Sequence, residues 1–83
     1  PNAITPNGDG SNDTWVIREL ITFPENEIII LNRWGDVVFS ASPYQNDWDG
    51  TYNGKPLPAG TYYYIIKLDN ISESVTGPIT IIK

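Results

Sequence analysis

Short apolar segments alternate with clusters of turn-forming residues along the whole chain. The clusters combine Gly, Pro, Asn, Asp and Ser, as in PNGDG, FPEN, RWGD and SPYQND, and recur about every 8 to 12 residues. The segments between them are rich in Ile, Val, Tyr, Thr and Trp, the side chains that fit a pleated, half-buried strand. The pattern therefore predicts a domain that is nearly all β.

We expect five main strands, at about residues 14–17, 27–33, 36–41, 61–69 and 75–83, with shorter pairings near Ala3 and Asp47. Reversals in NRWGDVVF and KLDNISESV indicate two β-hairpins. The segment ELITFP can form one helical turn, which ends at Pro24 because proline lacks the backbone donor. About seven short antiparallel strands in a chain of 83 residues indicate an immunoglobulin-like antiparallel β-sandwich, with a small β-barrel as the alternative.

Alternation of side chains within the strands predicts which residues form the core. In TYYYIIKLD and the C-terminal segment, the expected core positions are Tyr62, Tyr64, Ile66, Leu68, Ile79 and Ile81. The segment EIIIL, residues 27–31, is apolar without interruption. It fits either a strand covered on both faces or a strand whose outer face meets a partner.

Length and composition indicate one module of a longer protein. A chain of 83 residues fits a single small core. It has no run of about 18 apolar residues and no basic, apolar leader, so we expect no membrane insertion and no signal peptide within it. It begins with Pro1 and contains no methionine, which suggests excision from a larger polypeptide. Residues 1–83 are therefore interpreted as one domain.

Charge and residue types exclude several functions. Five Lys and Arg stand against ten Asp and Glu, and the cations are scattered, so no basic surface is available for nucleic acid. The lack of cysteine excludes disulfides, zinc ribbons and thiol catalysis. With no histidine, no cysteine and only scattered serines, no pair of nucleophile and base can be assembled. We therefore expect that the domain is not an enzyme.

The segment TPNGDGSNDTW is a candidate calcium loop. Oxygen-bearing side chains occupy every second position, at Asn7, Asp9, Ser11 and Asp13, with two glycines between them that let the backbone curve. Calcium prefers six to eight oxygen ligands, which these side chains and nearby carbonyls can supply in part. The spacing does not match an EF-hand. The other interpretation is a turn in which these side chains cap backbone amides.

Aromatic residues beside turns are candidates for binding. Trp48 lies between Asp47 and Asp49, a combination that suits a carbohydrate, although a core indole followed by an Asp-Gly turn is the favoured interpretation. Trp34 precedes Gly35 and is either packed over a strand or an exposed contact at the end of the sandwich. The sequence favours packing for both residues, because large aromatic side chains dominate small cores.

Four segments in order carry a resemblance that spans essentially the whole chain. TPNGDGSNDTW, ILNRWGDVVF, NDWDGTYNGKPLPAGTYYYII and GPITIIK together resemble the gliding-motility-associated C-terminal domain, the type B C-terminal sorting domain of the type IX secretion system. One departure is Trp15, where the family more often has Phe. The resemblance implies an immunoglobulin-like sandwich at the C-terminus of a surface protein or secreted enzyme, with gliding adhesins as typical cargo.

The resemblance also implies a function. The domain is expected to direct an N-terminally fused cargo through the periplasm and outer membrane to the cell surface or medium. Its expected partners are the type IX translocon and surface attachment proteins, and a monomer is expected. The alternative is a calcium-dependent adhesive or spacer module that uses Trp48, Tyr52 and the loop at residues 7–13.

A targeting signal that acts after folding must be a rigid surface. The outer face of EIIIL or an unpaired edge strand is a reasonable docking surface of this kind. Together with the turn aromatics, this reasoning gives a set of candidate partner-binding residues: Ile29, Leu31, Arg33, Trp34, Trp48 and Asp49. Calcium is the one cofactor considered, and it would bind at the loop described above.

Overall fold

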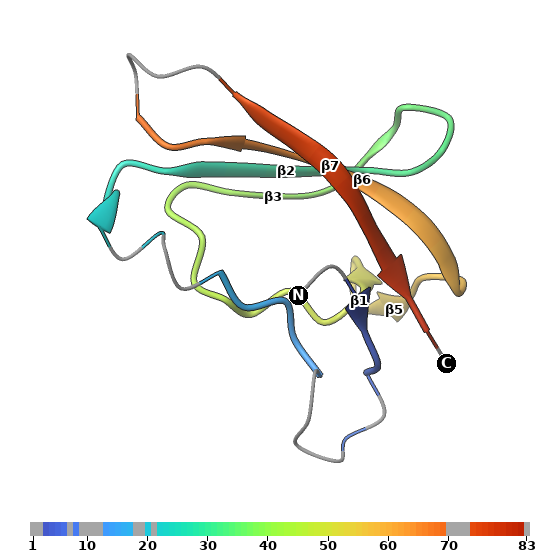
Figure 1. Cartoon of the computed structure of the whole chain (residues 1–83). Helices are drawn as coiled ribbons and strands as arrows, with labels where there is room; N and C mark the ends of the chain where they lie inside the picture. The colour runs from blue at the N-terminus through green and yellow to red at the C-terminus, as the bar shows by residue number, and fades with distance from the viewer. Residues whose placement is uncertain are drawn as a thin grey trace.

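The computed structural model describes residues 3–6, 8, 13–17, 20, 22–69 and 74–82. This part of the chain is all β, as predicted, with seven strands in two sheets (Figure 1). The strands are β1 (Ala3–Ile4), β2 (Glu27–Leu31), β3 (Val37–Ala41), β4 (Thr51–Tyr52), β5 (Lys55–Pro56), β6 (Gly60–Lys67) and β7 (Val75–Ile81). Within these residues, no helix is long and apolar enough to span a membrane.

The main sheet has five strands in the order β1-β7-β6-β2-β3. β6 pairs antiparallel with β7 on one side and with β2 on the other, so that Ile65 lies opposite both Thr76 and Ile29. β3 pairs antiparallel with β2 and forms one end of the sheet. At the other end β1 runs parallel to β7, so this one pair departs from the antiparallel pattern that we expected.

A tight turn at residues 32–36 joins β2 to β3. The side-chain oxygen of Asn32 accepts hydrogen bonds from the backbone N–H groups of Trp34 (2.9 Å) and Asp36 (3.0 Å). Gly35 has a φ of 86°, a left-handed conformation that glycine adopts without steric cost. The hairpin expected from NRWGD is thus confirmed, and Arg33 and Trp34 lie at its tip.

A second layer covers one face of the main sheet. It consists of the β4–β5 sheet and the non-strand segments 13–17 and 42–50, which lie below the main sheet in Figure 1. A hydrogen bond from Trp15 N to Trp48 O (3.0 Å) joins these two segments. The architecture is therefore sandwich-like and consistent with the immunoglobulin-like fold that we expected, although irregular chain makes up most of one layer.

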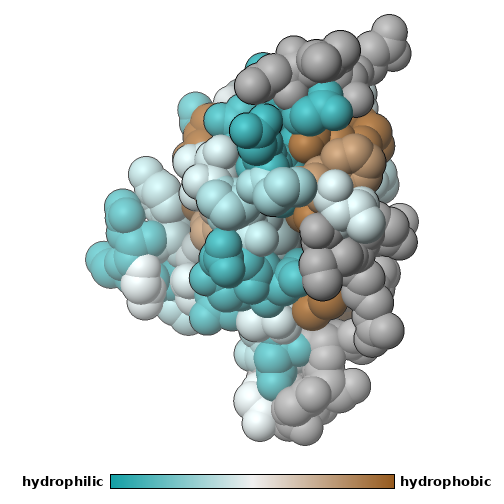
Figure 2. Space-filling model, turned by 90° about the vertical axis from the view of Figure 1, so that its left-hand side faces the viewer, coloured by the Kyte–Doolittle hydropathy of each residue, from teal (hydrophilic) through white to brown (hydrophobic). Residues whose placement is uncertain are grey.

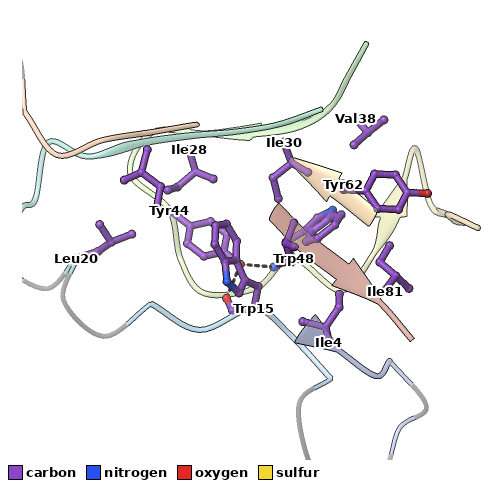
Figure 3. Close-up of a cluster of buried hydrophobic side chains, with 12 residues drawn as sticks. Ile4, Trp15, Leu20, Ile28, Ile30, Val38, Tyr44, Trp48, Tyr62 and Ile81 are labelled. Atoms are coloured by element: carbon purple, nitrogen blue, oxygen red, sulfur yellow. Dashed lines mark hydrogen bonds between the residues drawn. The ribbon is translucent and has the colours of Figure 1, made fainter. Parts of the chain in front are cut away.

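The core lies between the two layers (Figure 3). Its buried hydrophobic side chains are Ile4, Trp15, Leu20, Ile28, Ile30, Val38, Tyr44, Trp48, Tyr62, Ile66, Ile79 and Ile81. The expected burial of Tyr62, Ile66, Ile79 and Ile81 is confirmed, while Tyr64 and Leu68 are partly buried and pack against this cluster. The alternation of side chains along each strand explains why these positions face inward together.

Two expectations about the second layer are wrong. The segment 14–17 is not a strand, because its polar groups bond elsewhere: Trp15 O accepts from the Tyr44 hydroxyl and Ile17 N donates to the Asn46 side chain. The short pairing expected near Asp47 lies further along the chain, in the β4–β5 hairpin. The turn of that hairpin is Asn53-Gly54, and both residues have positive φ, as the usual two-residue hairpin turn requires.

The helical turn that we expected in ELITFP is present in part. Leu20 and Thr22 have 3₁₀ geometry, and Phe23 N donates a hydrogen bond to Leu20 O at 2.9 Å. The main chain then turns again at Pro24 and enters β2 at Glu27. This turn brings Leu20 into the core from outside the sheet.

Candidate docking surface

The outer face of the main sheet, opposite the core, presents a group of apolar side chains. We define the outer face by Ile29 and Leu31 of β2, Tyr63 and Ile65 of β6, and Pro78 of β7. The register places Leu31 opposite Tyr63 and Tyr63 opposite Pro78, with Ile29 opposite Ile65 in the next outward row. Tyr63 and Pro78 are exposed, and the other three are half-buried. The group is therefore contiguous across three strands.

The structure decides between the two alternatives for the EIIIL segment, residues 27–31. Ile28 and Ile30 are fully buried, whereas Ile29 and Leu31 alternate with them and lie on the outer face. Of the two alternatives left open by the sequence, the one with an outward apolar face is the one that the strand adopts. Figure 2 shows one end of the molecule, where hydrophilic side chains predominate and hydrophobic atoms form separate patches. Exposed apolar side chains also occur outside the outer face, among them Val37 and Tyr52.

The tip of the β2–β3 turn, which follows Leu31 in the chain, carries a charged and an aromatic side chain. The Arg33 guanidinium carbon lies 4.2 Å from the centroid of the Trp34 ring, which is a cation–π contact. Trp34 is 73% exposed, so the packing that the sequence favoured for this ring is wrong, and the stacked pair does not belong to the core. A cavity of about 190 Å³ separates this tip from the segment 58–62.

Tyr62 lines the same cavity from β6. Its hydroxyl donates a hydrogen bond to Pro58 O at 2.8 Å, which fixes the loop before β6 against the strand. Burial raises the pKa of Tyr62, and the nearby Arg33 guanidinium lowers it to a smaller extent. Tyr62 is therefore neutral at ordinary pH and serves as a donor.

Trp48 and Asp49 do not join the outer face. Trp48 is only 1% exposed, and its ring packs against Phe39 and Tyr62 in the core at centroid distances of 6.1 and 6.3 Å. Its ring is therefore closed to a stacking ligand, whereas Tyr52, the other aromatic residue of the adhesive alternative, is 48% exposed. Asp49 is exposed and accepts a hydrogen bond from the Thr51 hydroxyl at 2.7 Å, which fixes the local turn.

Sequence reasoning missed Tyr44, which joins the irregular parts of the second layer. Its buried hydroxyl donates to Trp15 O (2.5 Å) and accepts from Trp48 N (3.0 Å), as drawn in Figure 3. Its backbone N–H donates to the side chain of Asn26 at 2.9 Å. Burial raises the pKa of the Tyr44 hydroxyl above its ordinary value, and the bond from Trp48 opposes that rise. The only sequence signal was an aromatic residue directly after a Ser-Pro turn.

The candidate calcium ligands fall mostly outside the described residues. Asn7, Asp9 and Ser11 are among the residues that the structure does not describe. Asp13 is described, and its carboxylate accepts a hydrogen bond from Gly8 N at 3.0 Å, the type of bond expected for a capped turn. The described residues contain no group of three or more acidic, His or Cys side chains that could hold a metal. Calcium binding stays a prediction.

Comparison with known families identifies the chain. The model of the CHU_C type IX secretion signal domain matches residues 1–81. The chain belongs to this family. Comparisons with curated proteins and with solved structures gave no match. The resemblance found in the sequence is thereby confirmed at the level of the family.

Membership of the type IX secretion signal family indicates the general role of this domain. A type IX secretion signal domain is a C-terminal targeting module and not a catalytic one, and it implies interaction with the type IX secretion machinery and export to the cell surface or medium. The geometry is in keeping with this role, because the outer face offers apolar area on paired strands.

Proposed function

We propose that the type IX secretion machinery recognises this signal domain in its folded state, through the outer face. The observation that carries the proposal is the row Leu31–Tyr63–Pro78, which exposes apolar area on the side of the sheet opposite the core. Contiguous exposed apolar groups on a small soluble domain are characteristic of interaction surfaces. The domain performs no chemistry on its cargo in this proposal.

The outer face is supported by the most regular part of the fold. β2 is paired on both sides, with β3 and β6, and β6 is paired on both sides, with β2 and β7. Their outward side chains therefore have fixed spacing, and a partner does not have to order them on binding. A surface of this kind exists only once the sheet has formed. A partner that binds it therefore distinguishes the folded domain from the unfolded chain.

The surroundings of the outer face resemble the border of a protein interface. Oppositely charged Glu27 and Lys67 pair across β2 and β6 at one end of the apolar rows. At the other end β2 leads directly from Leu31 into the turn that carries Arg33 and Trp34. Arg and Trp are enriched among residues that dominate binding energy, and a polar rim around an apolar centre is the usual arrangement. We therefore include this turn in the docking surface.

The remaining details of the proposal rest on family membership and the resemblance. The cargo is fused on the N-terminal side, the domain acts as a monomer, and its partners are the outer-membrane translocon and the surface attachment proteins. The cargo passes through the periplasm, and a gliding adhesin of the cell surface is the type of cargo that fits best.

A reporter fusion tests the proposal. Residues 1–83 are fused to the C-terminus of a fluorescent protein that carries an export signal, in a host with a type IX system. We expect the fusion at the surface or in the medium and the reporter without the domain in the periplasm. Equal periplasmic retention of both proteins would contradict a targeting role for this chain. Export that persists after denaturing core substitutions would contradict recognition of the folded state.

A further inference from the structure

Among the strands that the structure describes, β3 forms an end of the main sheet and has one unpaired edge. Its residues pair only with β2, at Ile28↔Ala41, Ile29↔Ser40, Ile30↔Phe39 and Leu31↔Val37. Among the described residues, no backbone hydrogen bond joins residues 37–41 to any other segment. In an antiparallel strand, alternate residues direct their N–H and C=O groups to opposite sides. The free edge of β3 therefore presents main-chain donors and acceptors for a further strand.

This edge lacks most features by which proteins protect an unpaired strand. Natural edges carry charged residues or proline, or are very short. The sequence of β3 is VVFSA, without charge or proline. A register shift between Ile30 and Leu31 marks a bulge near the start of β3, but the pairs from Phe39 to Ala41 are regular. At the opposite end of the sheet, β1 has two residues, and β7 contains Gly77 and Pro78. The two ends are therefore protected unequally.

A groove accompanies the free edge of β3. It has a volume of about 430 Å³ and is lined by residues 37–40 of β3 and residues 51–53 at the β4 hairpin. Two apolar residues that line the groove are exposed to solvent, Val37 with an exposed fraction of 51% and Tyr52 with one of 48%. None of the lining residues is charged, although the domain carries a net charge of -5. The lining therefore suits an uncharged ligand and offers nothing to a basic peptide or a nucleic acid.

We infer that the free edge of β3 is a strand-addition site that accepts an extended, uncharged strand of a partner protein. The added strand lies about 4.8 Å from β3 and extends the sheet by main-chain hydrogen bonds. Its inward side chains enter the groove between Val37 and Tyr52. This site adjoins the outer face, because Val37 lies opposite Leu31 and Ser40 lies opposite Ile29. It uses the main-chain edge of the sheet and not that face, and it does not depend on the export role.

A tethered probe strand tests the inference on the purified chain. Six residues of alternating Thr and Val are appended after Lys83 through about 20 Gly and Ser residues, whose root-mean-square span is roughly 25 Å. That span matches a domain of 36 × 29 × 21 Å, and such tethers give millimolar effective concentrations. The control chain carries Pro in place of each Val, which removes backbone donors. The readout is amide hydrogen exchange at residues 37–41.

We expect hydrogen exchange to slow by about tenfold or more at the β3 amides that point away from β2. This protection should appear with the Thr-Val probe and not with the Thr-Pro probe. The double variant Val37→Lys/Ser40→Lys should lose this protection, because Lys on the edge opposes pairing. The double variant Val75→Lys/Ser74→Lys makes the same residue changes at other exposed positions and should keep it. Equal exchange with both probes, or protection at β7 instead of β3, would overturn the inference. Because no export is measured, such a failure leaves the targeting role untouched.

Discussion

The hydroxyl of Tyr44 donates a hydrogen bond of 2.5 Å to the backbone carbonyl of Trp15, 29 positions away in the sequence. The same oxygen accepts a bond from Trp48 N, so one side chain satisfies backbone groups of two irregular segments. These segments form most of the layer that covers the core. The relationship explains how a layer with few strand hydrogen bonds is held in place beneath the sheet.

Replacement of Tyr44 by Phe should destabilise the domain. The variant retains the ring but removes the hydroxyl that bonds to Trp15 O and Trp48 N, and the loss of a partner by a buried polar group such as Trp48 N costs roughly 1–3 kcal/mol. We expect a loss of at least about 1 kcal/mol in the free energy of unfolding, measured by urea titration. Tyr52→Phe, at an exposed tyrosine, is the matched control and should change little. Equal stabilities of the two variants would show that the Tyr44 hydroxyl is dispensable.

Stability should fall at alkaline pH because of Tyr44. Burial raises the pKa of its hydroxyl in the folded state above the unfolded value near 10. The folded chain then holds a proton that the unfolded chain releases, so the stabilising contribution is complete below about pH 10 and declines as pH rises further. The decline is at most about 1.4 kcal/mol per pH unit for one group. Urea titrations from pH 8 to 11 should show it, with a smaller slope in Tyr44→Phe.

Gly77 provides space for a tyrosine across the sheet. Tyr64 pairs with Gly77, and a Cβ at Gly77 would lie 2.5 Å from the Tyr64 hydroxyl oxygen and 2.7 Å from its Cζ. The Tyr64 ring also packs on Trp15 at a centroid distance of 5.0 Å, so it cannot move freely. Gly77→Ala should therefore cost about 1–3 kcal/mol of unfolding free energy.

A double-mutant cycle separates this steric effect from any other effect of Gly77→Ala. In the background Tyr64→Ala the three atoms nearest to the added methyl are gone, so Gly77→Ala should cost clearly less there. Thermal unfolding of the four proteins gives the coupling energy. Additive costs would mean that the contact between Tyr64 and residue 77 does not limit the strand.

Local patterns in the sequence were sufficient to place the longer strands of the main sheet and the residues of β6 and β7 that face the core. The alternation in TYYYIIKLD and in the last strand placed Tyr62, Ile79 and Ile81 correctly, because each strand has one face toward the core. Segment 14–17 was wrongly predicted as a strand, because its conformation depends on hydrogen bonds with Tyr44 and Asn46, which lie far away in the sequence. No local pattern contains that information.

The candidate site was only partly accessible from the sequence. Ile29 and Leu31 stood out through the unbroken run EIIIL, yet their direction followed only from the register with Tyr63 and Ile65. Trp48 drew attention as an aromatic beside two carboxylates, but its ring is in the core. The free edge of β3 depends on strand order, which is a property of the whole sheet.

The central claim is that the outer face, in the folded domain, directs export. The most direct measurement compares export of the reporter fused to Tyr63→Lys and to Val75→Lys, two exposed residues of the main sheet with exposures of 46% and 47%. Circular dichroism and thermal unfolding first establish that both variants are folded. We expect Tyr63→Lys to remain in the periplasm, because it places a charge at the centre of the outer face, and Val75→Lys to reach the surface or medium. Export of folded Tyr63→Lys at the level of Val75→Lys would contradict the account.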